Sequence, residues 1–185
     1  MPTQYEAGMR HARYYAEILH QAEAAYMEGG PFLDEGLNRF DLEKPNITTA
    51  QDWLEKNMES YEDATALCAV FVDAGAYLFH LRIPPAERIR WREASLRAAQ
   101  ILEAREVEGV HLGSIATAYH DMGDVRKAIP YYEQYLAIAR ETGDRHSEGV
   151  VLGNLGNAYY DLGDSRRASE LHRKHAAITR EVDDL

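Results

Sequence analysis

The chain of 185 residues contains a single cysteine, Cys68, and this scarcity excludes an intramolecular disulfide. Cys68 lies in the apolar run ATALCAVFVDAGAYLF, where we expect a small buried core residue rather than a reactive thiol. Asp73 interrupts this run, so we expect it to be too short to span a bilayer. The first residues, MPTQYEAGMRHARYY, lack the apolar core of a signal peptide. These features together predict a cytoplasmic protein.

Positive charge is also scarce. The chain has 20 Lys and Arg residues against 31 Asp and Glu residues, which gives a formal net charge of −11. Nucleic acids and anionic membrane surfaces both require clustered Lys and Arg, so we expect neither as a partner. A protein or peptide partner that is basic or neutral fits this balance better.

The motifs of several enzyme classes are missing. None of the 13 glycines is followed by Lys, so there is no Walker A phosphate-binding loop, and neither HExxH nor CxxC occurs. His172 and His175 share a helix face, but the sequence offers no evident third metal ligand. We expect this pair to mark a polar end of a helical array rather than a metal site. Acidic pairs such as Asp183–Asp184 are expected to be solvated. The sequence therefore predicts no catalytic residue, no metal and no cofactor.

An internal duplication dominates the second half of the chain. Aligning residues 108–145 with residues 148–185, an offset of 40, gives 17 identities in 38 positions. Apolar residues in each copy follow helical spacing on both sides of a Gly-Asp pair. Glycine at 123 and 163 suits a left-handed helix end, and the following Asp suits the cap of the next helix. Each copy therefore predicts two helices joined by a tight turn.

These copies resemble the tetratricopeptide repeat. Its first-helix pattern appears as Ile115-Ala116 with Tyr119 and as Leu155-Gly156 with Tyr159. The small residue that opens its second helix appears as Ala128 and Ala168, and the aromatic residue that follows appears as Tyr132. The resemblance implies an all-α, right-handed α-solenoid of helical hairpins, with repeats at 107–143 and 147–182.

The remaining segments extend this scheme. Residues 62–103 are expected to form a degenerate repeat, with helices at 62–82 and 86–103, so that residues 61–185 are repeat-like. Residues 1–60 are expected to be an N-terminal helical cap. Helices at about 4–28, 32–39 and 48–58 are predicted there, with breaks at Gly29-Gly30-Pro31 and near Pro45. We expect all of these parts to form one continuous domain.

Upstream segments carry a second resemblance. HARYYAEILHQAEAAYMEGG, GLNRFDLEKPNITTAQDWLE and PPAERIRWREASLRAA resemble the region that joins the nucleotide-binding and repeat parts of bacterial NB-ARC/STAND-type ATPases. In that family these helices form a sensor and interaction arm, and a separate P-loop module hydrolyses ATP. The resemblance implies either a fragment of such a protein or a stand-alone relative.

The tetratricopeptide resemblance also suggests where a partner binds. Such solenoids bind partners in a concave groove lined by their first helices, and Asn157 is well suited to grip the backbone of an extended peptide. The residues expected in this groove are Ser114, Thr117, His120 and Asp121 in one repeat, and Asn154, Asn157, Tyr160 and Asp161 in the next. Some relatives grip a terminal carboxylate with Lys, but Gly113 and Gly153 stand where that Lys is expected.

Two rival functions remain open at this point. The repeats could self-associate into a homodimer through an exposed end of the solenoid, or they could close around a small ligand or signal peptide. One local irregularity is expected as well. Pro130 falls inside the predicted second helix of the first repeat, where it predicts a kink or a delayed helix start.

Overall fold

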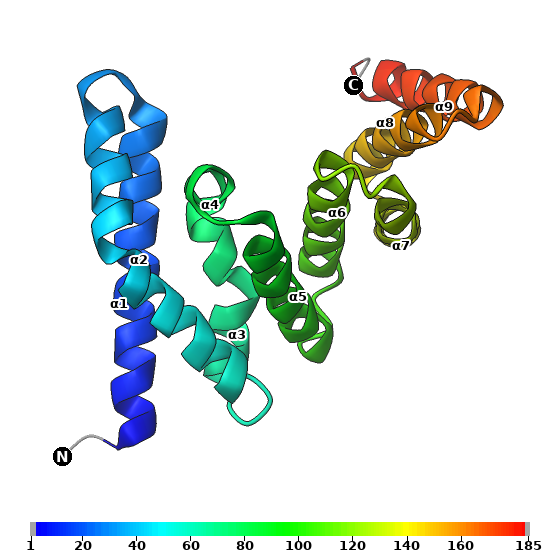
Figure 1. Cartoon of the computed structure of the whole chain (residues 1–185). Coiled ribbons are helices and arrows are strands. Elements are labelled where there is room, and N and C mark those ends of the chain that lie inside the picture. Colours follow the sequence, from blue (N-terminus) through cyan, green and yellow to red (C-terminus); the bar gives the residue numbers. More distant parts are fainter. Residues whose placement is uncertain (1–2, 184–185) are drawn as a thin grey trace. The chain divides into compact units, whose positions relative to one another are not determined.

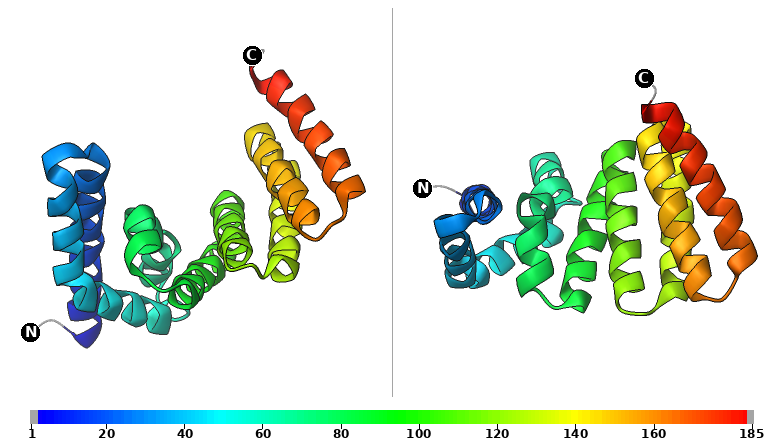
Figure 2. Two further views of the ribbon diagram at one scale, coloured as in Figure 1. Left: turned by 45° about the horizontal axis from the view of Figure 1, so that its top comes forward. Right: turned by 90° about the horizontal axis from the view of Figure 1, so that it is seen from above.

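The computed structural model describes residues 3–183 and, for Asp183, only the backbone. The chain divides into two compact units, Met1–Glu103 and Ala104–Leu185 (Figures 1 and 2). Every regular element within residues 3–183 is helical, which confirms the predicted all-α class.

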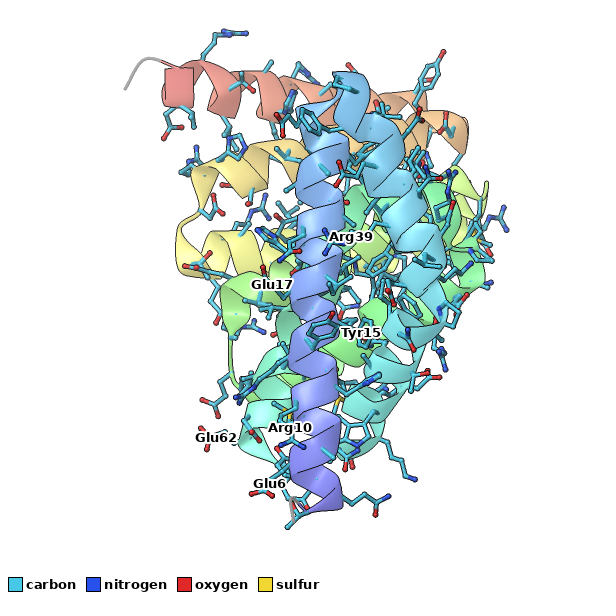
Figure 3. All side chains as sticks on the ribbon, turned by 90° about the vertical axis from the view of Figure 1, so that its left-hand side faces the viewer. Glu6, Arg10, Tyr15, Glu17, Arg39 and Glu62 are labelled. Atoms are coloured by element: carbon cyan, nitrogen blue, oxygen red, sulfur yellow. The ribbon has the colours of Figure 1, made fainter. Side chains whose placement is uncertain are left out.

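A long helical hairpin begins the first unit. Helix α1 (Gln4–Glu28) starts with a capping box, in which the Thr3 hydroxyl accepts the Glu6 N–H and the Glu6 carboxylate accepts the Thr3 N–H. The chain turns through a short 3₁₀ segment, η1 (Gly30–Phe32), into α2 (Leu33–Asn57). One face of α1 packs on α2, and Figure 3 shows Glu6, Arg10 and Glu17 along its length.

Helix α2 runs through Pro45, so the expected separate helices at 32–39 and 48–58 are wrong. Proline removes one backbone hydrogen bond and usually kinks a helix, at a cost of about 3 kcal/mol. Figures 1 and 2 show that α2 changes direction within its length. Phe40, Ile47 and Leu54 are all fully buried, on both sides of the proline. Their burial favours one bent helix over two separate ones.

The segment predicted as one helix at 62–82 is also different in the structure. It consists of α3 (Glu62–Phe71), the 3₁₀ turn η2 (Val72–Gly75) and α4 (Ala76–Arg82). At Gly75 a Cβ would lie 2.2 Å from Leu19 Cδ1, so α1 approaches the backbone closely at this turn. The Glu23 carboxylate of α1 accepts the N–H groups of Tyr77 and Leu78, at 2.9 and 3.1 Å. Helix α4 is therefore capped by a side chain from α1, which local sequence could not reveal.

We expected the apolar run around Cys68 to be too short to span a bilayer. By length and composition alone, that expectation is wrong. Residues Glu62–Arg82 form a stretch of 21 residues with a mean hydropathy of 1.5, which is long and apolar enough to cross a membrane. Half of this stretch is buried inside the protein, and the core helix of a folded domain meets the same criterion.

Helix α5 (Pro85–Ile101) packs on α3 and completes the first unit. As expected, it starts at the Pro84-Pro85 pair. Phe79 joins Phe40 and Trp91 in one core, with ring centroids 5.8 and 5.1 Å apart. The helices of residues 62–101 thus share a core with α1 and α2, and the first compact unit ends at Glu103.

The second unit consists of two helical hairpins, as the duplication predicts. Helices α6 (Arg105–Asp121) and α7 (Val125–Thr142) form the first, and α8 (Arg145–Asp161) and α9 (Ser165–Asp183) form the second. Helix α7 also packs on α8 and so joins the hairpins.

Glycine has the predicted role in the turns, and Asp has it in part. Gly123 and Gly163 have φ values of 79° and 81°, in the left-handed region. Asp164 accepts the Arg167 N–H at 3.0 Å, but Asp124 makes no capping hydrogen bond with its side chain. The Asp124 carboxylate pairs instead with Lys127 Nζ at 2.7 Å.

Pro130 does not delay the start of its helix. Helix α7 begins at Val125, and Pro130 is its sixth residue, so the expected delayed start is wrong. The earlier start leaves Ala128 and Tyr132 on one continuous helix, and both are buried against the neighbouring helices.

Cys68 is fully buried, and burial raises the pKa of its thiol to about 12. We expect a thiol reagent at neutral pH to label the native protein more than about a hundredfold more slowly than the denatured chain. Mass spectrometry of timed samples measures this rate, and the denatured chain provides the control. Rapid stoichiometric labelling of the native protein would contradict the buried position of α3.

Candidate polypeptide-binding face

The packing of α7 on α6 determines which side of α6 is turned outward. A Cβ placed on Gly109 or Gly113 would lie 2.9 or 2.8 Å from the Tyr135 ring, so both glycines are needed for this close approach. The Tyr135 hydroxyl continues past α6 and donates to Ser147 Oγ on α8 at 3.0 Å. This one tyrosine therefore ties α7 to both first helices.

Two histidines of α9 pack against α8 in the second hairpin. A Cβ on Gly156 would lie 2.6 Å from the His172 ring, and His175 Nδ1 lies 2.8 Å from the Gly149 carbonyl oxygen. His172 nevertheless stays exposed, whereas its repeat counterpart Tyr132 is buried under α8. The two rings thus pack within their own hairpin, at the end of the described array.

These contacts correct our expectation about the positions where some relatives have a Lys that binds a terminal carboxylate. Gly113 and Gly153 face Tyr135 and His175 of the second helices, so a Lys at either position would not point outward. The observation that argues against binding of a terminal carboxylate is that the basic side chains of these helices are already paired. The cationic residues of α6 and α8 are Arg105 and Arg145, which are engaged by Glu108 with Glu141 and by Glu148 with Glu181, respectively.

The outward side of the first helices carries the residues expected to bind a partner. We define the α6–α8 face as this set: Ser114, Thr117, His120 and Asp121 on α6, and Asn154, Asn157, Tyr160 and Asp161 on α8. All eight are exposed or half-buried. His120 Nε2 lies 2.7 Å from Asp161 Oδ2, which places the two helices side by side at their C-terminal ends.

The hydroxyl groups of Ser114 and Thr117 on this face are already engaged. Ser114 donates to the Val110 carbonyl oxygen at 2.9 Å, and Thr117 to that of Gly113 at 3.0 Å. Thr117 Oγ1 also lies 3.1 Å from the hydroxyl of Tyr132, whose pKa is raised by burial. Hydroxyl groups satisfied in this way have little to offer a partner.

The side chains of α8 are less engaged. Within the described residues, Asn154, Asn157 and Tyr160 make no side-chain hydrogen bond, and Tyr160 is 67% exposed. The same holds for the carboxylate of Asp121 on α6, which is exposed and has no ion pair among those residues. These four groups are available for binding, although nothing in the fold itself tests that role.

Sequence analysis missed two valines on the same face. Val110 and Val150 lie one turn before Ser114 and Asn154, and they are 47% and 43% exposed. They are identical in the alignment of the two repeats and follow the i, i+4 spacing of the face. That spacing was a usable signal, but valine in a helix is usually assigned to the core.

A charged network lies at the junction of the two repeats. Glu148 is only 8% exposed, and Arg140 of α7 and Arg145 of α8 both donate to its carboxylate. Burial alone would raise the pKa of the Glu148 carboxyl, but the two Arg hydrogen bonds outweigh it and lower this pKa. Arg140 thus connects the first repeat to the second.

The first unit also has surface hollows, where α1 and α3 begin. One of about 380 Å³ is lined by residues that include Arg10, Arg13 and Asp63. Asp63 is already engaged there, because its carboxylate accepts a hydrogen bond from the Tyr5 hydroxyl and lies 3.5 Å from the Arg13 guanidinium. Burial and the Asp63 bond raise the pKa of Tyr5 to about 12, so its hydroxyl remains a donor. These bonds hold the start of α1 against the start of α3, which suits a structural role more than a ligand site.

Comparisons with known proteins agree with this geometry. Residues 107–181 match the family model of the tetratricopeptide repeat, and no curated protein matches the chain. The structure resembles a Signal Transduction ATPase with Numerous Domains (STAND) protein with a tetratricopeptide repeat sensor from Pyrococcus horikoshii. The identity is 22% and the TM-score 0.65, over 94% of this chain and 25% of that chain. BtubC (BKLC) from P. vanneervenii is 16% identical, with a TM-score of 0.53 over 95% of this chain and 74% of that chain.

At identities this low, the similarity shows a shared fold and nothing more. The expected likeness to a STAND protein is found at that level, and this chain spans about a quarter of that protein's length. The family match begins at residue 107, so the repeat character expected for residues 62–103 stays a prediction.

Replacing Glu148→Gln is expected to lower the free energy of unfolding by about 1–2 kcal/mol at pH 7, because two charge-assisted hydrogen bonds are weakened. A lowered folded-state pKa stabilises the fold above the unfolded-state pKa, near 4.5 for Glu, and this contribution is lost as the pH falls through the folded-state value. The difference between wild type and variant should therefore shrink below pH 4.5.

Urea denaturation at several pH values measures this difference. Glu181→Gln, which alters an exposed carboxylate on the same Arg145, is the matched control and should cost less. An equal loss in both variants, or a difference independent of pH, would show that the Glu148 network does not join the repeats as described.

Proposed function

We propose that the chain is a protein-interaction module whose α6–α8 face binds another polypeptide, because residues 107–181 match the family model of the tetratricopeptide repeat. Tetratricopeptide domains generally mediate protein–protein interactions. The same proposal gives the chain a binding role without catalysis.

The observation that carries this proposal is the pair of uncommitted amides, Asn154 and Asn157, on the outward side of α8. A side-chain amide donates and accepts at once, so it can pair with the peptide backbone of a partner whatever the partner's sequence. Tyr160 stands beside them with two thirds of its surface exposed, and Tyr is enriched at binding hot spots. The same face of α6 is aligned with them through His120 and Asp161.

A broader role follows from the likeness to the STAND protein. In that protein the tetratricopeptide repeat part is named a sensor. We extend the proposal accordingly: this chain is the sensor or regulatory arm of a larger STAND-type signalling ATPase. A partner bound on the α6–α8 face would then shift the ATPase between conformations, in proportion to its preference for one of them. A cytoplasmic location belongs to the same proposal.

The non-catalytic role is supported by the chemistry of the shifted groups. Glu148 and Asp144 have lowered pKa values because they accept hydrogen bonds from Arg140 or from Ser147, respectively, and Cys68 is buried. Each shift has a structural cause in packing or capping. None of these groups lies on the α6–α8 face beside a second group that could act as its acid or base.

Binding at the α6–α8 face is tested by a variant that changes only exposed side chains. Asn157→Ala combined with Tyr160→Ala removes one amide and one exposed ring, and should weaken partner capture at least tenfold, since hot-spot residues each contribute more than about 1 kcal/mol. Immobilised protein is incubated with lysate, and captured proteins are quantified by mass spectrometry. Arg173→Ala with Lys174→Ala, on exposed positions of α9, is the matched control. Unchanged capture of every partner by the groove variant would refute this site.

Self-association is the rival that the structure favours less. The outward side of α9 is polar, with Ser169, His172 and Arg173 all exposed. Stable homodimer interfaces are more apolar than the average surface. We therefore expect a monomer in sedimentation velocity from about 1 to 100 µM protein, a range that covers typical dimer affinities. A concentration-dependent shift to a dimer would instead support the rival.

A further inference from the structure

The outward side of each first helix has the same order of chemistry from beginning to end. On α6 it runs through Val110, Ser114, Thr117 and Asp121, and on α8 through Val150, Asn154, Asn157 and Asp161. The steps of four, three and four residues keep these positions on one side of a helix. The valines are about half exposed, so each helix has an apolar part and a carboxylate part on the same surface.

The carboxylate end is not neutralised by the protein. Asp121 has no ion pair within the described residues, and Asp161 has only the ring nitrogen of His120. From residue 106 to 121 and from residue 146 to 161 the sequence contains neither Lys nor Arg. Two exposed carboxylates on neighbouring helices attract a guanidinium or ammonium group.

The valine end differs in charge. One turn before the valines, the same surface carries Glu106 on α6 and His146 on α8. This end thus has a single carboxylate beside two exposed aliphatic side chains, whereas the far end has two carboxylates. The two ends therefore favour different side chains of a partner.

The length of this surface sets the spacing of those side chains. Eleven residues separate Val110 from Asp121, and Val150 from Asp161, which is about 16 Å at a helical rise of about 1.5 Å per residue. An extended peptide covers this distance in about five residues, at about 3.3 Å each. A helical peptide lying along the same axis would need about eleven.

The amides between the two ends select the extended form. Asn154 and Asn157 lie between Val150 and Asp161, and they have no hydrogen-bond partner within the described residues. A helical ligand has satisfied its own backbone groups, so it would leave both amides without a backbone partner. An extended ligand presents free N–H and C=O groups that the amides can pair with.

We propose that the α6–α8 face recognises an extended peptide segment with an aliphatic side chain and, about five residues away, a lysine or arginine. This inference rests on the proposed function and adds the chemistry of the partner to it. The aliphatic side chain lies at Val110 and Val150, the basic side chain lies between Asp121 and Asp161, and the backbone pairs with the two amides.

The test uses fluorescent peptides in a Gly/Ser background and the full chain. Each peptide contains one Leu and one Arg at a spacing of two, five or eleven residues, in both orders, and each has a twin with Glu in place of Arg. We expect the five-residue spacing to bind most tightly in one of the two orders, as measured by fluorescence anisotropy. The Glu twin should bind at least tenfold more weakly, since attraction is replaced by repulsion, and added salt should weaken the Arg peptide.

Variants of the protein locate the contact. Asp121→Asn with Asp161→Asn should weaken the Arg peptide about three- to tenfold, the range of exposed ion pairs. Asp121→Asn alone keeps the His120–Asp161 contact, so a loss in this variant does not come from breaking that contact. Glu133→Gln with Glu170→Gln, on α7 and α9, changes the net charge equally and should leave the affinity unchanged.

The outcomes separate this inference from the proposed function. Equal binding of Arg and Glu peptides, or a preference for the spacing of two or eleven, overturns the inference even if Asn154→Ala and Asn157→Ala weaken binding. The absence of binding by every peptide in the set overturns it as well. The proposed function is judged independently, by partner capture with the Asn157→Ala and Tyr160→Ala variant.

Discussion

Close contact between glycines of a first helix and a ring of the second helix is the constraint on which the repeat unit depends. Tyr135 covers Gly109 and Gly113 at distances that leave no room for a methyl group. This contact fixes the rotation of α6 about its own axis. Because that rotation is fixed, the side of α6 with Thr117 and Asp121 must face outward. The outward position of these residues is thus a consequence of how the other side of α6 is packed.

The second hairpin has a related contact at a different glycine: a Cβ on Gly156 would lie 2.6 Å from the His172 ring, whereas one on Gly153 would lie 3.5 Å from the His175 ring. His172 and His175 occupy the places of Tyr132 and Tyr135, and their rings still lie over the glycines of α8. Histidine can pack as a flat ring and remain wet at its edge, which suits a helix whose outer side is exposed. The outer side of α9 is thus polar, whereas the junction of α7 with α8 is apolar.

In the first unit, α1 has a comparable organising role. Its Leu19 presses on the backbone at Gly75, and its Glu23 supplies the cap of α4. An apolar stretch that would otherwise continue as one helix is therefore divided into two. The division lets α3 pack on α5, with Cys68 inside. A ring also covers a glycine in this unit, because a Cβ on Gly8 of α1 would lie 2.2 Å from the Trp53 ring of α2, and the core is built around Phe40 and Trp91.

The sequence by itself determined the two hairpins and their turns at Gly123 and Gly163. These depend on periodicity and on left-handed glycines, which are local properties. Only the tertiary structure decided that α2 continues through Pro45, that residues 62–82 divide at η2, and that His120 meets Asp161. In each of these cases the energy comes from groups far apart in the chain, and a local pattern contains no record of such contacts.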